Sequence, residues 1–94
     1  MEFKIAIKVE YKSGRYRQVS WYKSNPVFVS GKGEDETRRP ATAEELKKSI
    51  TSSLLQLMKD KEIRSFEDSL TNKTVIIHFA DVSEVEVTVE EVAG

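Results

Sequence analysis

Five lysine and tyrosine residues in the first quarter of the chain have types and spacing that suit the binding of nucleic acid. They are Lys4, Lys8, Lys12, Tyr16 and Tyr22. On a pair of strands they share one face, because successive side chains of a strand alternate between its two sides. Ammonium groups neutralise phosphates and tyrosine rings stack on unpaired bases, so this face would suit a single strand. We favour the alternative, a solvated face whose lysines lie beside acidic residues of a neighbouring strand.

Charge is distributed unevenly along the chain, although the net charge of its 94 residues is only −1. Residues 1–32 contain seven Lys or Arg and two Glu, whereas residues 80–94 contain five acidic residues and no basic one. Such asymmetry is typical either of a basic binding end with an acidic tail or of two adjacent strands with facing charges. The chain as a whole lacks the basic character that nucleic-acid-binding domains usually have.

Two other groups of residues have reactive chemistry but no catalytic spacing. Residues 31–39 contain Gly-Lys-Gly, three acids and two arginines, yet they lack the spacing of a P-loop, and consecutive acids do not converge on a cation without a fixed turn. We expect a solvated loop in which Arg38 and Arg39 offer a weak anchor for an acidic partner. His78 is the only histidine, and we expect it to be partly buried and structural. The sequence therefore predicts no catalytic residues, no metal site and no cofactor.

The first two strands are predicted by alternation of apolar and polar residues from position 2 onward. Two hairpin registers compete. A two-residue turn would pair Ile5 with Tyr22, whereas a three-residue turn with a left-handed Gly14 would pair Ile5 with Trp21 and Ile7 with Val19. We prefer the three-residue turn, because it buries Trp21 beneath the helix and leaves both tyrosines and Ser20 on the exposed face.

A single long helix is predicted over residues 43–60. Thr42 and Glu45 have the spacing of a capping box at its start. Apolar residues then recur at helical spacing and form one stripe: Leu46, Ile50, Leu54, Leu57 and Met58.

The remaining segments are shorter. They are a strand at 27–29, a flexible loop at 30–41, a return segment with a helical turn at 63–70, an inner strand at 74–79 and a half-exposed strand at 84–90. The predicted fold is a single α+β domain of residues 1–94 with the order β-β-(β)-α-β-β. In it, a mainly antiparallel sheet of four to five strands carries the helix on one face.

The composition indicates a small intracellular protein. Hydrophobic residues make up 38% and charged residues 33% of the chain, and cysteine is absent. Small secreted domains usually rely on disulfides, which this chain cannot form. The sequence has no signal-peptide core at its start and no apolar run long enough to span a membrane. We therefore expect a cytoplasmic location.

These observations predict a non-enzymatic protein-interaction or accessory domain that acts through its sheet face or an open edge, with a homodimer as one form of the complex. Phe28, Leu55, Phe66 and Ile76 have no place in the predicted core, and as one patch they would form an interface. The alternative is a single-stranded nucleic-acid-binding module that uses the lysines and tyrosines of the first hairpin. The sequence implies no membrane partner and no small-molecule substrate.

Overall fold

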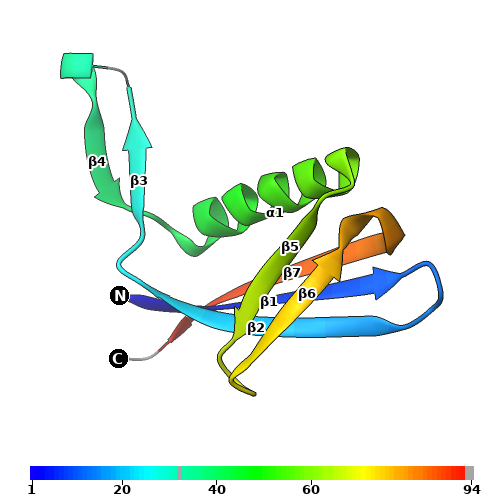
Figure 1. Ribbon diagram of the computed structural model, residues 1–94. Helices are drawn as coiled ribbons and strands as arrows, with labels where there is room; N and C mark the ends of the chain where they lie inside the picture. Colours follow the sequence, from blue (N-terminus) through cyan, green and yellow to red (C-terminus); the bar gives the residue numbers. More distant parts are fainter. Residues whose placement is uncertain (32, 93–94) are drawn as a thin grey trace.

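The computed structural model describes residues 1–31 and 33–92 and has the predicted α+β class (Figure 1). The elements in chain order are β1 (Glu2–Tyr11), β2 (Tyr16–Ser24), β3 (Val27–Ser30), the 3-10 turn η1 (Gly33–Asp35), β4 (Thr37–Pro40), α1 (Ala43–Asp60), β5 (Ile63–Asp68), β6 (Lys73–His78), the 3-10 turn η2 (Phe79–Asp81) and β7 (Val82–Val92). All strand pairs are antiparallel. The strands form three sheets, β2-β1-β7, β3-β4 and β5-β6, where we had expected one sheet of four to five strands.

β1 and β2 pair in the register of the three-residue turn, which confirms that prediction. Ile5 lies opposite Trp21 and Ile7 opposite Val19. Gly14 has a φ of 91°, a conformation that residues with a Cβ rarely adopt. The register places the long apolar side chains of both strands on the same face, and the core packs against this face.

The buried face of the three-stranded sheet is covered jointly by α1 and the β5–β6 hairpin. α1 lies against β7, whereas β5 lies against β2 (Figure 1). The side chains of the central core come from all of these layers: Ile7, Val9, Val19, Leu54, Val75, Ile77, Phe79 and Val82. Trp21 is half-buried at the margin of this core and stacks on Phe66 of β5, with ring centroids 6.0 Å apart. Trp21 is thus covered by the second hairpin, where we had expected the helix.

α1 has the predicted bounds, and its capping box is complete. The Glu45 N–H donates to Thr42 Oγ1 at 3.2 Å, and the Thr42 N–H donates to Glu45 Oε1 at 3.0 Å. After the helix, Lys61 adopts a left-handed conformation, and its N–H donates to the carbonyl of Met58 at 3.3 Å. Leu54 is the buried centre of the predicted stripe, and the other four members are half-buried.

Residues 63–68 form strand β5, so the helical turn predicted there is wrong. The spacing of Ile63, Phe66 and Leu70 resembles that of an apolar helix face. However, Ile63 and Leu70 are 60% and 61% exposed, and of the three residues only Phe66 packs against the core. The prediction of an inner strand at 74–79 is also wrong, because β6 pairs with β5 alone. Its apolar residues on both faces reflect one core-facing side and one exposed side.

The segment predicted as a loop at 30–41 contains most of a hairpin. β3 and β4 pair from Val27–Pro40 to Ser30–Thr37, and Lys32 lies outside the described residues. We call residues 27–31 and 33–40 the arm, because they project from the rest of the molecule (Figure 1). The Cα radius of gyration is 14.8 Å, larger than the value of about 12 Å expected for a compact domain of this length. The flexibility expected for this segment stays a prediction.

Candidate protein-interaction surfaces

Four of the five sequence-predicted binding residues lie on one face of the three-stranded sheet. Lys4 lies directly opposite Tyr22. The Nζ atom of Lys8 lies 4.8 Å from the centre of the Tyr16 ring, within the range of a cation–π contact. The fifth, Lys12, lies in the hairpin turn and is exposed. The hairpin therefore brings lysines and tyrosines together, and their role in binding stays a prediction.

β7 adds glutamates to the same face. Glu90 lies opposite Lys4, and Glu86 lies opposite Lys8. Glu84 lies opposite Glu10, which extends the acidic side of the face. The facing of basic and acidic residues from adjacent strands explains the charge asymmetry of the sequence. Because lysines alternate with glutamates here, the face lacks the continuous positive charge that a phosphate backbone requires.

Ser20 lies on the same face of the sheet as Lys4 and Tyr22, as predicted, but it is buried where we had expected it to be exposed. The residue is 1% exposed, and its main-chain groups contact Asp68 and Ser69 at the end of β5. The Ser20 N–H donates to Asp68 Oδ1 at 3.2 Å, and the Ser20 carbonyl accepts from the Ser69 N–H at 2.7 Å. Both outward-pointing main-chain groups of β2 are therefore satisfied at the middle of the strand. No further strand can pair with β2 at this point.

The Asp68 carboxylate is held by several donors at once. The Thr71 hydroxyl donates to Oδ2 at 2.7 Å, and the Leu70 N–H donates to Oδ1 at 3.2 Å, in addition to the bond from Ser20. The hydrogen bond from Thr71, followed by those from the main chain, lowers the pKa of Asp68 against the opposing effect of burial. Asp68 is therefore ionised at neutral pH and closes the β2 edge as an acceptor.

β7 is the open edge of this sheet. Its partner is β1, and the described residues form no main-chain hydrogen bond to its other side. Main-chain groups alternate in direction along an antiparallel strand. The N–H and C=O groups of Ser20 point away from β1, so those of its partner Ala6 point toward Thr88 of β7. Along β7 the direction then alternates. The N–H and C=O groups of Val85, Val87 and Val89 consequently point away from β1, toward the open side of β7.

The arm exposes three consecutive apolar residues on β3. Val27, Phe28 and Val29 are 55%, 36% and 48% exposed. Since side chains alternate along a strand, the two valines share one face of the arm and Phe28 lies on the other. Phe28 is partly covered by Arg39, whose guanidinium carbon lies 4.4 Å from the ring centre.

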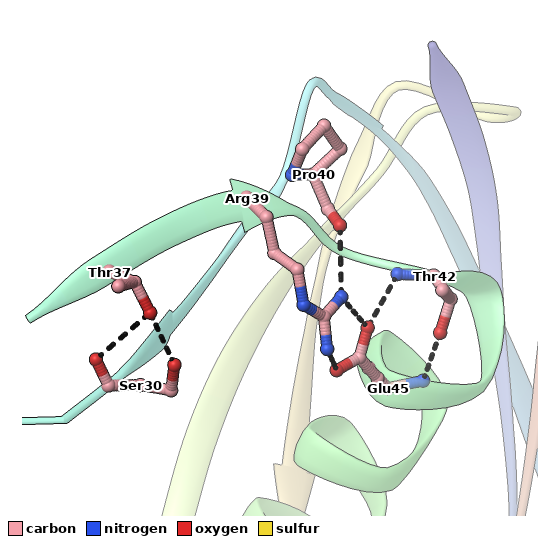
Figure 2. Close-up of polar contacts among 6 residues, drawn as sticks. All are labelled: Ser30, Thr37, Arg39, Pro40, Thr42 and Glu45. Atoms are coloured by element: carbon pink, nitrogen blue, oxygen red, sulfur yellow. Dashed lines mark hydrogen bonds and ion pairs between the residues drawn. The ribbon is translucent and has the colours of Figure 1, made fainter.

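The arm is fastened to the start of α1 at its base (Figure 2). The Arg39 guanidinium donates two hydrogen bonds, of 2.7 and 2.6 Å, to the Glu45 carboxylate, which also accepts from the Thr42 N–H. The hydrogen bonds from Arg39 and from the Thr42 main chain lower the pKa of Glu45 to about 2. The Ala41 N–H donates to the Pro26 carbonyl at 2.9 Å and closes the base. These contacts set the direction of the arm.

Two clefts flank the base of the arm. The first has a volume of about 380 Å³ and lies between the arm and the start of β1, with a lining that includes Phe3, Pro26, Val27, Arg38 and Pro40. The second, of about 450 Å³, lies between the arm and α1, with a lining that includes Phe28, Val29, Ala41 and Leu46. Both volumes are in the range of sites that accept small molecules or side chains of a partner. We call the first of them the arm cleft.

The apolar residues that lacked a place in the predicted core do not form one patch. Phe66 is partly buried at the margin of the core, where its ring contacts those of Trp21 and Phe79. Phe28 lies on the arm, Leu55 on the exposed side of α1 and Ile76 on the outer face of β6. The predicted joint interface is therefore wrong. Phe28 lies beside the exposed valines of the arm, whereas Ile76 shares the outer face of the β5–β6 hairpin with the exposed Ile63.

His78 is exposed at the end of β6, which corrects the prediction that it is partly buried. It lies opposite Ile63 of β5. Among residues 1–31 and 33–92, no three His, Asp or Glu side chains are placed to hold a metal ion. In the same ranges, no helix has both the length and the apolar character needed to cross a membrane.

Sequence reasoning missed the arm as a surface. The available signal was Val-Phe-Val followed by a connection with two glycines. The returning strand, Thr37–Pro40, has neither alternation nor β-branched apolar residues, so its pairing with β3 could not be seen.

Comparison of the chain with protein-family models, with curated proteins and with solved structures found no match. The interpretation of these surfaces therefore rests on their geometry and chemistry.

Proposed function

We propose that this chain is a protein-binding domain that uses the arm and the arm cleft to hold an apolar segment of a partner protein. The observation that supports the proposal most is the exposure of Val27 and Val29 on an element that projects from the body. A two-stranded hairpin is at best marginally stable alone in water. Contiguous exposed apolar side chains on such an element are typical of association surfaces.

The valine face of the arm also indicates what the partner segment contains. Val27 lies opposite Pro40, and Val29 lies opposite Arg38, so this face combines aliphatic surface with one guanidinium. Arg38 pairs with Glu36 at 3.1 Å, but its side chain is 72% exposed, and exposed pairs contribute little. An acidic group of a partner can replace Glu36. The segment that fits best has apolar side chains for the cleft and one carboxylate near Arg38.

The apolar contacts supply most of the expected affinity. Complete burial of a valine side chain contributes roughly 1.5–3 kcal/mol. Val27 and Val29 are already about half covered, so their remaining burial contributes about 1 kcal/mol each. Replacement of both by serine should therefore weaken binding at least tenfold, since 1.4 kcal/mol corresponds to a factor of ten.

Affinity capture from cells that naturally express the protein tests this proposal. The arm variant carries Val27→Ser and Val29→Ser, and the matched control carries Leu55→Ser and Ile76→Ser, two equally exposed apolar residues elsewhere. The unchanged protein and the control should capture the same partner, and the arm variant should lose it. Equal capture by all three would exclude the arm as the contact surface.

Light scattering at several concentrations tests whether the partner is a second copy of this chain. An increase in mass that the arm variant abolishes would identify a homodimer formed through the arm. A monomer mass that does not change with concentration would mean that the partner bound by the arm is a different protein.

The nucleic-acid alternative has weaker support, because Glu86 and Glu90 lie opposite the lysines of the first hairpin. Titration with mixed single-stranded oligonucleotides at about 50 mM salt, where phosphate contacts are strong, tests it directly. Binding that Lys4→Gln with Lys8→Gln abolishes would support it, and the absence of binding would exclude it. We propose no reaction for the chain.

A further inference from the structure

We propose that β7 accepts an additional antiparallel strand from another protein, one whose side chains alternate between apolar and basic residues. This site is separate from the arm and does not depend on the function proposed above. Three observations support it. The outer edge of β7 is open, its side chains alternate between valine and acidic residues, and β1 already pairs with β7 through the basic and apolar residues that such a pattern requires.

The outer side of β7 is available for pairing. The N–H and C=O groups of Val85, Val87 and Val89 point away from β1, and no described segment bonds to them. β7 is 11 residues long and contains no proline, and its register irregularity lies at its first residues, opposite Glu10 and Tyr11. Its central part therefore lacks proline and a bulge, two features that natural proteins use to block an edge, whereas the alternate glutamates and the packing of α1 against β7 limit which strand can pair there. The opposite edge of the sheet, on β2, is closed at Ser20 by Asp68 and Ser69.

The side chains of β7 define the pattern of the added strand. Val85, Val87 and Val89 are half-buried and lie on the core side of the sheet. The alternate positions carry exposed acidic side chains at Glu84, Glu86 and Glu90. Directly opposed residues of an antiparallel pair share a face and interact. An added strand therefore gains contacts when apolar residues lie opposite the valines and cationic residues opposite the glutamates.

β1 already provides such a complement on the other side of β7. Lys4 lies opposite Glu90 and Lys8 opposite Glu86, while the apolar residues of β1 lie opposite the valines. The same strand thus shows which sequence pairs well with β7.

A second copy of β7 is a poor occupant of this edge. A symmetric antiparallel pairing centred on Val87 would place Glu84 opposite Glu90 twice, and like charges that face each other destabilise a strand pair. β2 of a second copy is closed at Ser20 by its own Asp68. The occupant is therefore a basic and apolar extended segment of a different protein.

A seven-residue peptide of alternating lysine and valine is the probe. Its control is the same peptide with glutamate in place of lysine. The lysine peptide should bind with strong salt dependence and slow the amide hydrogen exchange of Val85, Val87 and Val89 at least tenfold. Equal binding of the glutamate peptide, or protection that maps outside β7, would overturn the proposal.

Variants of β7 complete the test. Glu86→Gln with Glu90→Gln should weaken the lysine peptide about fivefold, as expected for two cross-strand charge pairs. The control, Glu34→Gln with Asp35→Asn, removes the same charge at the tip of the arm and should leave binding unchanged. Equal weakening by both variants would mean general charge attraction and would overturn the proposal.

Val87→Pro tests the main-chain contribution. Proline is tolerated on an edge strand where its missing N–H faces solvent, so the pairing with β1 is retained. A folded Val87→Pro protein should bind the peptide more than tenfold more weakly, and undiminished binding would overturn the proposal. If this variant does not fold, the double variant Glu86→Gln with Glu90→Gln and the amide hydrogen exchange of β7 decide whether the peptide pairs with this edge. The arm variant Val27→Ser with Val29→Ser should bind the peptide normally, which separates this site from the arm.

Discussion

The carboxylate of Asp68 accepts a hydrogen bond of 3.2 Å from the main-chain N–H of Ser20, which lies 48 residues earlier in the chain. Together with the bond from the Ser69 N–H to the Ser20 carbonyl, this contact closes the outer edge of β2 at Ser20. The three-stranded sheet thus has one edge that is closed at Ser20 and one open edge on β7, and the arm forms a separate exposed apolar element. The arm and the buried core are built from different segments, so residues of the arm can be altered without changing the core.

Asp68→Ala should destabilise the protein and open the β2 edge. The buried Ser20 N–H would lose its acceptor, which carries a desolvation cost, and the exposed edge would favour strand pairing between molecules. Thermal unfolding should show a lower Tm, and light scattering should show assembly that increases with concentration. Glu67→Ala, at an exposed neighbouring position, is the control and should change neither. An unchanged Tm and mass for Asp68→Ala would contradict the role assigned to this carboxylate.

The ion pair at the base of the arm should make stability depend on pH in the acidic range. The pKa of Glu45 is lowered from 4.5 to about 2 in the folded protein, chiefly by its hydrogen bond from Arg39. The folded state therefore binds fewer protons than the unfolded state. The stabilisation is complete above about pH 4.5 and is lost as the pH falls toward 2.

Thermal unfolding of the unchanged protein and of Glu45→Gln between pH 2 and 7 checks this expectation. The difference in Tm should be largest above pH 5 and should shrink toward zero near pH 2. Asp68 titrates in both proteins, so its contribution cancels in the comparison. A Tm difference that is independent of pH would show that Glu45 acts through packing alone.

Two adjacent isoleucines of β6 should differ sharply in their effect on stability. Ile77 is fully buried, whereas Ile76 is 60% exposed. Ile77→Ala should lower the free energy of unfolding by about 2–5 kcal/mol, as for other buried large-to-small changes. Ile76→Ala should change it by less than about 0.5 kcal/mol. Urea unfolding measures both values, and similar losses for the two would contradict the face assignment of the β5–β6 hairpin.

The first hairpin and the helix could be predicted because their signals are local. Gly14 and the preference for burying Trp21 selected the register, and Thr42 with Glu45 marked the helix start. The pairing of the N-terminal lysines with Glu86 and Glu90 was also foreseeable as one of two alternatives. The hairpin and the helix depend on residues whose spacing in the sequence determines their spacing in the structure, whereas the facing of lysines and glutamates was inferred from the uneven distribution of charge.

The other features depend on contacts between distant segments. Ser20 is buried and its main chain contacts Asp68 and Ser69 at the end of β5, and nothing near Ser20 in the sequence indicates these contacts. Phe66 has helical spacing to Ile63, yet residues 63–68 pair with β6 as a strand, and Phe66 then stacks on Trp21. The arm was missed because β4 becomes a strand only through its pairing with β3.

Site-specific photo-crosslinking tests the central claim, that the arm is the protein-binding surface, most directly. A photoreactive phenylalanine analogue would replace Val29 of the arm in one protein and Leu55 of α1 in another, and both would be irradiated in cells that express the chain. The account predicts one specific crosslinked protein product from position 29 and none from position 55. Specific products from position 55 alone, or equal products from both positions, would contradict it.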